Sequence, residues 1–155
     1  MTSVSARRTL AAPPGTVFDV LADPTAHVAI DGTGWVRQEV DAQPITALGQ
    51  VFRMGMFHPD HPDGDYEIHN LVVAFDRPRA IAWKPGYVAD DGSLAFGGWV
   101  WRYDLRPLTA GTEVTLTYDW SGVPPEGHQV LTFPPFPPDH LTSSLAHLAE
   151  LASRE

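Results

Sequence analysis

The sequence predicts an α+β fold, in which a curved antiparallel sheet surrounds a C-terminal helix and an apolar cavity lined by aromatic side chains. Three observations predict this fold class. Six consecutive segments have extended or alternating patterns, and short turns rich in proline, glycine and aspartate separate them. Connections this short favour antiparallel neighbours. A leucine stripe near the C-terminus then predicts one amphipathic helix.

The N-terminal part of the chain is predicted to form a strand followed by two short helices. Residues 5–12 have an extended pattern that ends at two prolines, and proline is tolerated in the first turn of a helix. Apolar residues then recur at helical spacing as far as Leu21. Asp23 is the expected N-cap of a second short helix over residues 25–30.

The six strands that follow each place apolar side chains on one face and polar side chains on the other. Because residues i and i+2 of a strand share a face, Trp101 and Tyr103 point away from Arg102. This pattern is typical of a sheet that is covered on one side only. We expect these strands at residues 35–40, 49–58, 65–75, 79–84, 96–105 and 113–121.

The last element is predicted to be a helix because leucines recur at spacings of four, three and three residues from Leu141 to Leu151. Residues 133–138 contain four prolines and form a stiff, extended lead-in, and Asp139 is the expected cap. A helix of about fifteen residues is about 22 Å long. It is too short to fill a curved sheet that carries many large rings, so we expect a cavity beneath it.

The side chains assigned to the covered face form the predicted ligand site. The strand over residues 65–75 has no clear polar face, and we assign His69, Leu71, Val73 and Phe75 to the inside. Aromatic and apolar walls with a few polar tips are typical of ligand pockets. The residues predicted to line the cavity are Phe52, Met54, Met56, His69, Leu71, Val73, Trp83, Trp99, Trp101, Tyr103, Leu116, Tyr118, Trp120, Leu141, Leu145 and Leu148.

Composition excludes several classes of protein. The 155 residues carry a net charge of −9, which repels phosphate backbones, so we expect no nucleic-acid partner. Cysteine is absent, which excludes disulfides, thiolate nucleophiles and cysteine-ligated metals. No apolar run is long enough for a signal peptide or a membrane span. We therefore expect one cytoplasmic domain over residues 1–155, a monomer or a homodimer, without a cofactor.

Histidines together with neighbouring aspartates are the candidates for metal ligands. His58, His61 and His69 lie close together among aspartates, but residues 58–65 are typical of an exposed hairpin connection. We therefore predict no metal site. We also expect three other histidines to be exposed, namely His27, His128 and His140.

Candidates for catalysis are equally few. The serines lack a Gly-x-Ser-x-Gly context, and the chain has no glycine-rich loop that could bind phosphate. A cyclisation or dehydration would need only a positioned acid or base beside the bound molecule. His69 and Tyr118 are the two candidates, and no catalytic role is assigned to either of them.

Several motifs resemble those of a known superfamily in order and over nearly the whole chain. They lie at residues 12–24, 31–34, 75–83, 101–105 and 111–120. The chain resembles the START-like or Bet v 1-like (SRPBCC) superfamily, most closely its bacterial polyketide cyclase/dehydrase-like branch. The resemblance implies a helix-grip fold, with a seven-stranded sheet around a C-terminal helix and a hydrophobic cavity between them. Members of the superfamily bind lipids, sterols, polyketides or plant hormones, and some cyclise or dehydrate aromatic polyketides.

Three classes of function follow from the sequence. The leading hypothesis is the binding of a small hydrophobic molecule, such as a lipid or a polyketide, in the cavity. The second is an enzyme of the cyclase, dehydratase or aromatase type, which would use the same cavity and would need polar groups that converge inside it. The third is a protein-interaction module of the co-chaperone type, which would need an exposed apolar patch.

Overall fold

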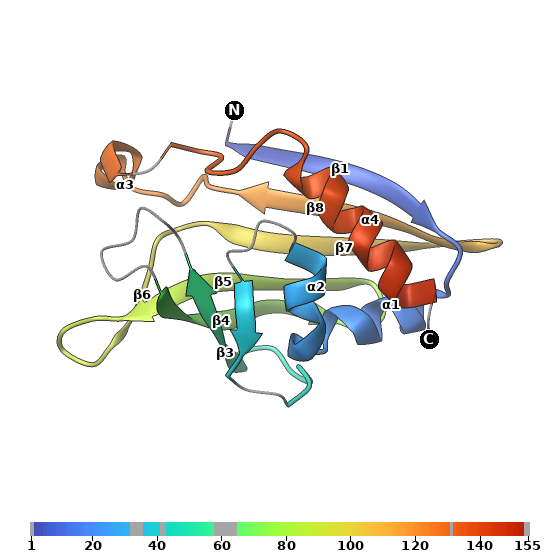
Figure 1. The fold of residues 1–155 in the computed structure, drawn as a ribbon, viewed down its shortest axis with the longest axis horizontal. Coiled ribbons are helices and arrows are strands. Elements are labelled where there is room, and N and C mark those ends of the chain that lie inside the picture. The colour runs from blue at the N-terminus through green and yellow to red at the C-terminus, as the bar shows by residue number, and fades with distance from the viewer. Residues whose placement is uncertain (1, 32–35, 41–42, 58–64, 131, 154–155) are drawn as a thin grey trace.

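The computed structural model describes residues 2–31, 36–40, 43–57, 65–130 and 132–153 (Figure 1). Its element order, a strand, short helices, a run of strands and a C-terminal helix, confirms the predicted fold class. The strands are β1 (Ser3–Leu10), β2 (Val36–Glu39), β3 (Val51–Phe57), β4 (Asp65–Asp76), β5 (Ala80–Val88), β6 (Leu94–Phe96), β7 (Val100–Leu108) and β8 (Gly111–Asp119). The helices are α1 (Pro14–Leu21), the 3-10 helix η1 (Pro24–Ala26), α2 (His27–Asp31), α3 (Pro125–Val130) and α4 (His140–Ser153).

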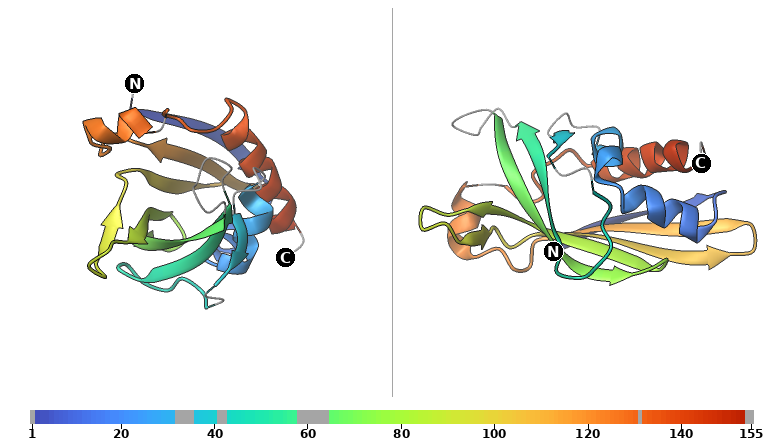
Figure 2. Two further views of the ribbon diagram at one scale, coloured as in Figure 1. Left: turned by 60° about the vertical axis from the view of Figure 1, so that its left-hand side comes forward. Right: turned by 90° about the horizontal axis from the view of Figure 1, so that it is seen from below.

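The described strands form one antiparallel sheet in the order β1-β8-β7-β5-β4-β3-β2, with β6 paired to β5 outside this path. The sheet is curved, and the helices α1, α2 and α4 close its open side (Figure 2). Helix α4 contacts β1 at one edge, and α2 contacts both α4 and β2 at the other edge. The two edges of the sheet are therefore joined through helices, which is the helix-grip arrangement.

The N-terminal helices begin where the sequence predicts. Helix α1 follows Pro13, whose backbone is extended at φ −64° and ψ 156°. Asp23 caps η1, because its Oδ1 accepts hydrogen bonds from the backbone N of Thr25 at 3.0 Å and from its Oγ1 at 2.6 Å. The predicted N-cap is confirmed. The Gly-Thr-Gly motif over residues 32–34 lies outside the described residues.

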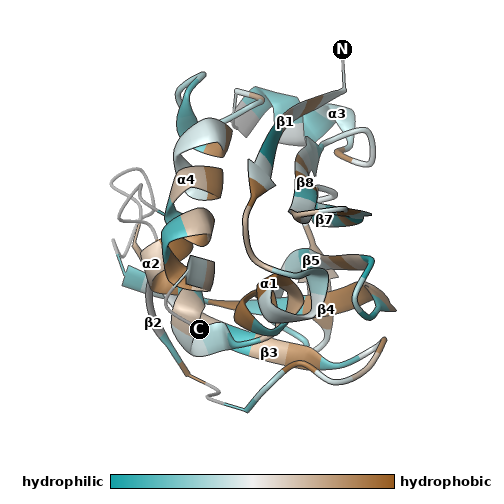
Figure 3. Ribbon diagram, turned by 90° about the vertical axis from the view of Figure 1, so that its right-hand side faces the viewer, coloured by the Kyte–Doolittle hydropathy of each residue, from teal (hydrophilic) through white to brown (hydrophobic). Residues whose placement is uncertain are grey.

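The inner face of the sheet follows the predicted alternation in β3, β7 and β8. Tyr118 and Leu116 on β8 are 1% and 0% exposed. Arg102 on β7 is exposed and pairs with Asp104 at 3.0 Å on the outer face. The leucines of α4 complete the core, and the hydrophobic part of the helix turns towards the inside of the sheet (Figure 3).

Strand β4 departs from the predicted facing. Asn70 and Val72 are 4% and 1% exposed, and they occupy the inner face. His69, Leu71 and Val73 therefore lie on the outer face, where Val73 is 40% exposed. The assignment of these three side chains to the inside was wrong by one residue, and a slip of one residue moves every side chain to the opposite face.

A register shift between β4 and β5 explains this error. The pairing changes between Val72 and Ala74, so the alternation changes phase there. Beyond the shift, Phe75 returns to the inner side, and its ring lies 5.3 Å from that of Phe18 in an edge-to-face contact. The predicted inward position of Phe75 is confirmed. A period of two that starts at the inward-facing Phe75 and runs back along the strand therefore assigns His69, Leu71 and Val73 to the wrong face.

The predicted strand over residues 96–105 is divided into two. Strand β6 ends at Phe96 and β7 begins at Val100. Between them Gly98 has φ +104°, and a Cβ at this position would lie 2.4 Å from the carbonyl O of Gly122. Only glycine fits this turn. The turn leads directly into Trp99 and the inward face of β7.

Candidate ligand-binding site

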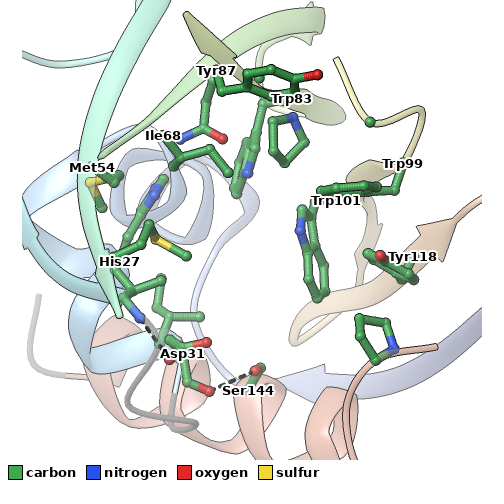
Figure 4. Close-up of a pocket in the computed structure, with 18 of the residues that line it drawn as sticks. His27, Asp31, Met54, Ile68, Trp83, Tyr87, Trp99, Trp101, Tyr118 and Ser144 are labelled. Atoms are coloured by element: carbon green, nitrogen blue, oxygen red, sulfur yellow. Dashed lines mark hydrogen bonds between the residues drawn. The ribbon is translucent and has the colours of Figure 1, made fainter. Parts of the chain in front are cut away.

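A cavity of about 450 Å³ lies between the inner face of the sheet and the helices α2 and α4 (Figure 4). Side chains of β2, β3, β4, β5, β7 and β8 complete its walls. Tyr87 on β5 belongs to the lining and is 55% exposed, so the cavity opens to the surface beside it. Volumes of about 300–1,000 Å³ are typical of small-molecule sites.

Aromatic rings form two opposite walls of the cavity. On one side the ring of His27 stacks on that of Trp83, with a centroid distance of 4.9 Å and an interplanar angle of 19°. On the other side the rings of Trp101 and Tyr118 lie 4.6 Å apart. Figure 4 shows His27 and Met54 across the cavity from Trp101 and Tyr118. Such ring faces offer a flat molecule a large apolar contact area.

His27 places a hydrogen-bond acceptor in the cavity wall. The side chain is 7% exposed, and its Nε2 lies 2.8 Å from the carbonyl O of Leu21. Because a carbonyl oxygen only accepts, Nε2 carries the proton and donates this bond. Burial lowers the pKa of His27, so the imidazole is neutral at pH 7. Its Nδ1 is therefore an acceptor.

Asn70 places a carboxamide in the same cavity. It is 4% exposed and pairs with Phe52 on β3 and with Pro85 on β5. Its side chain has no hydrogen-bond partner among the residues that the structure describes. Among those residues no side-chain nitrogen or oxygen that is sealed from solvent lacks a partner. The amide of Asn70 is therefore accessible from the cavity.

Two tyrosine hydroxyls lie in the wall formed by β7 and β8. Tyr103 and Tyr118 are 4% and 1% exposed, and both line the cavity. Burial raises the pKa of both phenols, and the charge of Asp31 raises that of Tyr103 further. Both hydroxyls therefore keep their protons at neutral pH and are able to donate hydrogen bonds.

Helices α2 and α4 meet beside the cavity. Ser144 Oγ donates a hydrogen bond of 3.2 Å to the carbonyl O of Asp31 (Figure 4). His140 Nε2 lies 3.9 Å from Asp31 Oδ1. Burial lowers the pKa of His140, and the charge of Asp31 opposes this shift without cancelling it. A neutral imidazole, which is able to accept a proton, therefore lies beside the aromatic wall.

The predicted lining residues divide into three groups. Those that line the cavity are Met54, Met56, Trp83, Trp99, Trp101, Tyr103 and Tyr118. Those that are buried in the core beside it are Phe52, Leu116, Trp120, Leu141, Leu145 and Leu148. His69, Leu71 and Val73 lie on the outer face, because the register shift in β4 reverses their direction.

The position of His69 removes the geometric basis for its candidacy as a catalytic residue. His69 is not among the lining residues, and its Nε2 lies 3.3 Å from Glu67 Oε1 at the edge of the cavity. Tyr118, the other candidate, does line the cavity. The expectation that His27 and His140 are exposed was also wrong, because both are 7% exposed between the sheet and the helices. His128 is exposed, as predicted.

The helical and polar part of the lining was not predicted from the sequence. It includes His27, Ile30, Asp31, Glu67, Asn70, His140 and Ser144. The sequence does contain a signal that some of these residues lie together. Residues 27, 30 and 31 have the spacing of one helix face, and residues 140 and 144 have the spacing of another. The burial of that face depends on how α2 and α4 pack together, which the spacing alone does not give.

Across the described part of the chain, no group of three His, Asp or Glu side chains is placed to hold a metal ion. His58 and His61 lie outside the described residues. The described residues also contain no helix of the length and apolar character needed to span a bilayer.

A curved antiparallel sheet closed by a C-terminal helix over an aromatic cavity defines a helix-grip protein. The chain belongs to the family described as polyketide cyclase / dehydrase and lipid transport, whose model matches residues 1–152. No curated protein matches the sequence significantly. The resemblance noted from the sequence motifs is thus confirmed.

Solved structures share this fold at low sequence identity. A protein of Chromobacterium violaceum has a TM-score of 0.67 and 18% identity, and the match covers 100% of both chains. A protein of Arthrobacter aurescens has a TM-score of 0.70 and 14% identity over 99% of this chain and 87% of the other. The Aha1 dimer of Colwellia psychrerythraea has a TM-score of 0.56 and 13% identity over 99% of this chain and 95% of the other.

Proposed function

We propose that the protein binds a small, flat and largely apolar molecule in the cavity between its sheet and α4. The observation that carries this proposal is an unfilled cavity that is lined by tryptophan rings. Trp83, Trp99 and Trp101 point to the inner side of the sheet, yet they are only partly buried. Interiors that serve stability alone are close-packed and contain few voids larger than a water molecule. The family to which the chain belongs supports the same function.

The size of the cavity limits the ligand. Its volume of about 450 Å³ lies in the lower part of the range of about 300–1,000 Å³ that is typical of sites for drug-sized molecules. A compound of two or three fused rings fits this volume. A lipid with two long acyl chains does not fit within it.

A titration with 1,4-naphthoquinone, an uncharged flat compound, tests the proposal. We expect saturable quenching of the indole fluorescence, because the quinone lies against the tryptophan faces. Trp101→Ala removes one of these faces and weakens binding by about tenfold. The affinity is measured by fluorescence, and circular dichroism verifies that the variant is folded.

The matched control is Arg102→Ala, one residue along β7. Arg102 is exposed on the outer face, where it pairs with Asp104, so the affinity of this variant stays within about twofold of the native value. Equal weakening in both variants, or no saturable quenching of the native protein, contradicts the proposal.

Acid–base catalysis in the same cavity is a second candidate function. His140 is neutral and lies 3.9 Å from Asp31, and the rings of His140 and Trp101 are 6.0 Å apart. Tyr118 in the same wall keeps its proton. One group is therefore able to accept a proton and another to donate one, which a cyclisation or dehydration requires. This candidate differs from the first because it requires conversion of the bound molecule.

A further inference from the structure

Two polar side chains share one end of the aromatic cavity. Asn70 on β4 is the cross-strand neighbour of Phe52 on β3. The ring of His27 lies 5.4 Å from that of Phe52, edge to face, and stacks on Trp83. His27 and Asn70 therefore share a neighbour, Phe52, and both belong to the cavity wall.

These two side chains set a condition on the ligand. His27 Nδ1 is an acceptor, and the amide of Asn70 offers one acceptor and two donor hydrogens. Among the described residues neither His27 Nδ1 nor the Asn70 amide has a hydrogen-bond partner. A purely apolar ligand would remove water from these groups and leave them without hydrogen bonds, which weakens its binding. A well-matched ligand supplies hydrogen bonds at this end.

The charge of the cavity sets a second condition. None of the residues described as lining it is a lysine or an arginine, whereas Asp31 and Glu67 are acids. A carboxylate or phosphate placed there would lose its hydration without gaining a positive partner, and burial of an uncompensated charge is costly. The cavity therefore disfavours fatty acids, phosphorylated compounds and other anions.

We propose that His27 and Asn70 form a polar subsite that selects an uncharged planar lactam, a ring with an N–H beside its carbonyl. The lactam carbonyl accepts from the Asn70 amide N–H and the lactam N–H donates to Asn70 Oδ1, so that the two amides pair, while His27 Nδ1 offers a second acceptor beside them. A ring with a hydroxyl beside a carbonyl matches less well, because its O–H is held by its own carbonyl. The inference rests on the proposed function and specifies the chemistry of its ligand.

Two isomeric probes test the subsite on the native protein. 3-Methyl-2-quinolinone keeps the N–H, whereas 1-methyl-2-quinolinone carries the same methyl group on the nitrogen and has no donor. Isothermal titration calorimetry should give an affinity about tenfold higher for the 3-methyl isomer, the value of one well-formed hydrogen bond. The anion 2-naphthoate should bind at least about tenfold more weakly than the 3-methyl isomer.

Substitution of Asn70 tests the residue assignment. Asn70→Leu keeps the approximate shape of the side chain and removes its donors and acceptor, so the variant should bind the two isomers with nearly equal affinity. The matched control, His69→Gln, alters the adjacent residue on the outer face and should preserve the preference. If Asn70→Leu fails to fold, the isomer pair measured on the native protein still decides.

The outcomes separate this inference from the proposed function. Equal binding of the two isomers by the native protein overturns the lactam subsite, while saturable binding of 1,4-naphthoquinone leaves the cavity function standing. Tighter binding of 2-naphthoate also overturns the subsite. If no quinolinone binds and the quinone does not bind either, both proposals fail.

Discussion

The two cavity histidines, His27 and His140, act as neutral hydrogen-bonding groups because of where the fold places them. Burial lowers the pKa of both, and in His140 this effect outweighs the opposing charge of Asp31. Neutral imidazoles add no positive charge to the cavity wall. A ligand that meets them needs a donor group rather than a negative charge.

The folding stability should therefore depend on pH in a defined direction. In the unfolded chain both histidines return to a pKa of about 6.5, above their values in the folded state. Below pH 6.5 the unfolded state binds more protons, so the free energy of unfolding decreases as the pH falls through this range. Well above pH 6.5 both histidines are neutral in the folded and in the unfolded state, so they add no pH dependence to the free energy of unfolding. Thermal melts between pH 8 and pH 5 measure the effect.

His27→Phe should reduce this pH dependence, although it also removes the bond to the carbonyl of Leu21 and lowers stability at every pH. His128→Phe is the control, because His128 is exposed on α3, and it should leave the slope unchanged. An identical slope in the native protein and in His27→Phe would show that burial of this imidazole does not govern the acid response.

At the residue scale, strand alternation predicted the inward rings of β7 and β8 but not the polar groups. Trp101 and Tyr118 follow from a period of two along single strands. Asn70 and His27 do not, because an asparagine or a histidine is more often exposed and its burial here depends on distant contacts. His27 is buried by Phe52 and Trp83, which lie 25 and 56 positions further along the chain.

Helix α4 is the element that closes the fold. It contains 14 residues, and Leu141, Leu145 and Leu148 are buried at 4%, 1% and 0% exposure. The helix contacts β1 at one edge of the sheet and α2 at the other side. The helix also contributes His140 and Ser144 to the cavity wall.

A charge in the leucine stripe should unfold the domain. Leu148→Asp removes a fully buried side chain and places a carboxylate without a partner in the core, at a cost of about 3–5 kcal/mol. Urea denaturation measures the loss. The control is Thr142→Asp, which changes an exposed position in the first turn of the same helix and should alter stability by less than about 0.5 kcal/mol. A Leu148→Asp protein as stable as the native one would contradict the packing of α4.

Elements with a strong period were predictable, and irregular ones were not. The leucine spacing located α4, and the Asp23 cap located η1. Strand β4 contains the apolar run Leu71–Ala74, which has no period of two, and the register shift beside Val72 is invisible in such a run. The short strand β6 and helix α3 carry too few residues for any period to identify them.

At the scale of the whole molecule, helices join the two edge strands of the sheet. The cavity lies between the sheet and these helices. Strands β1 and β2 are at opposite ends of the order, and α2 and α4 connect them. Most of the lining comes from the strands between these edges. The family resemblance predicted this architecture from motifs distributed along the chain. The monomeric or homodimeric state and the interaction-module hypothesis stay predictions.

Nuclear magnetic resonance of the tryptophan indole N–H groups tests the central claim, that the cavity binds a small flat molecule, most directly. Trp83, Trp99 and Trp101 line the cavity, whereas Trp120 is 5% exposed and lies in the adjacent core. During a titration with 1,4-naphthoquinone, we expect the signals of the three lining tryptophans to shift together with one dissociation constant, and that of Trp120 to shift much less. Signals of all three lining tryptophans that stay unchanged at saturating quinone would contradict the claim.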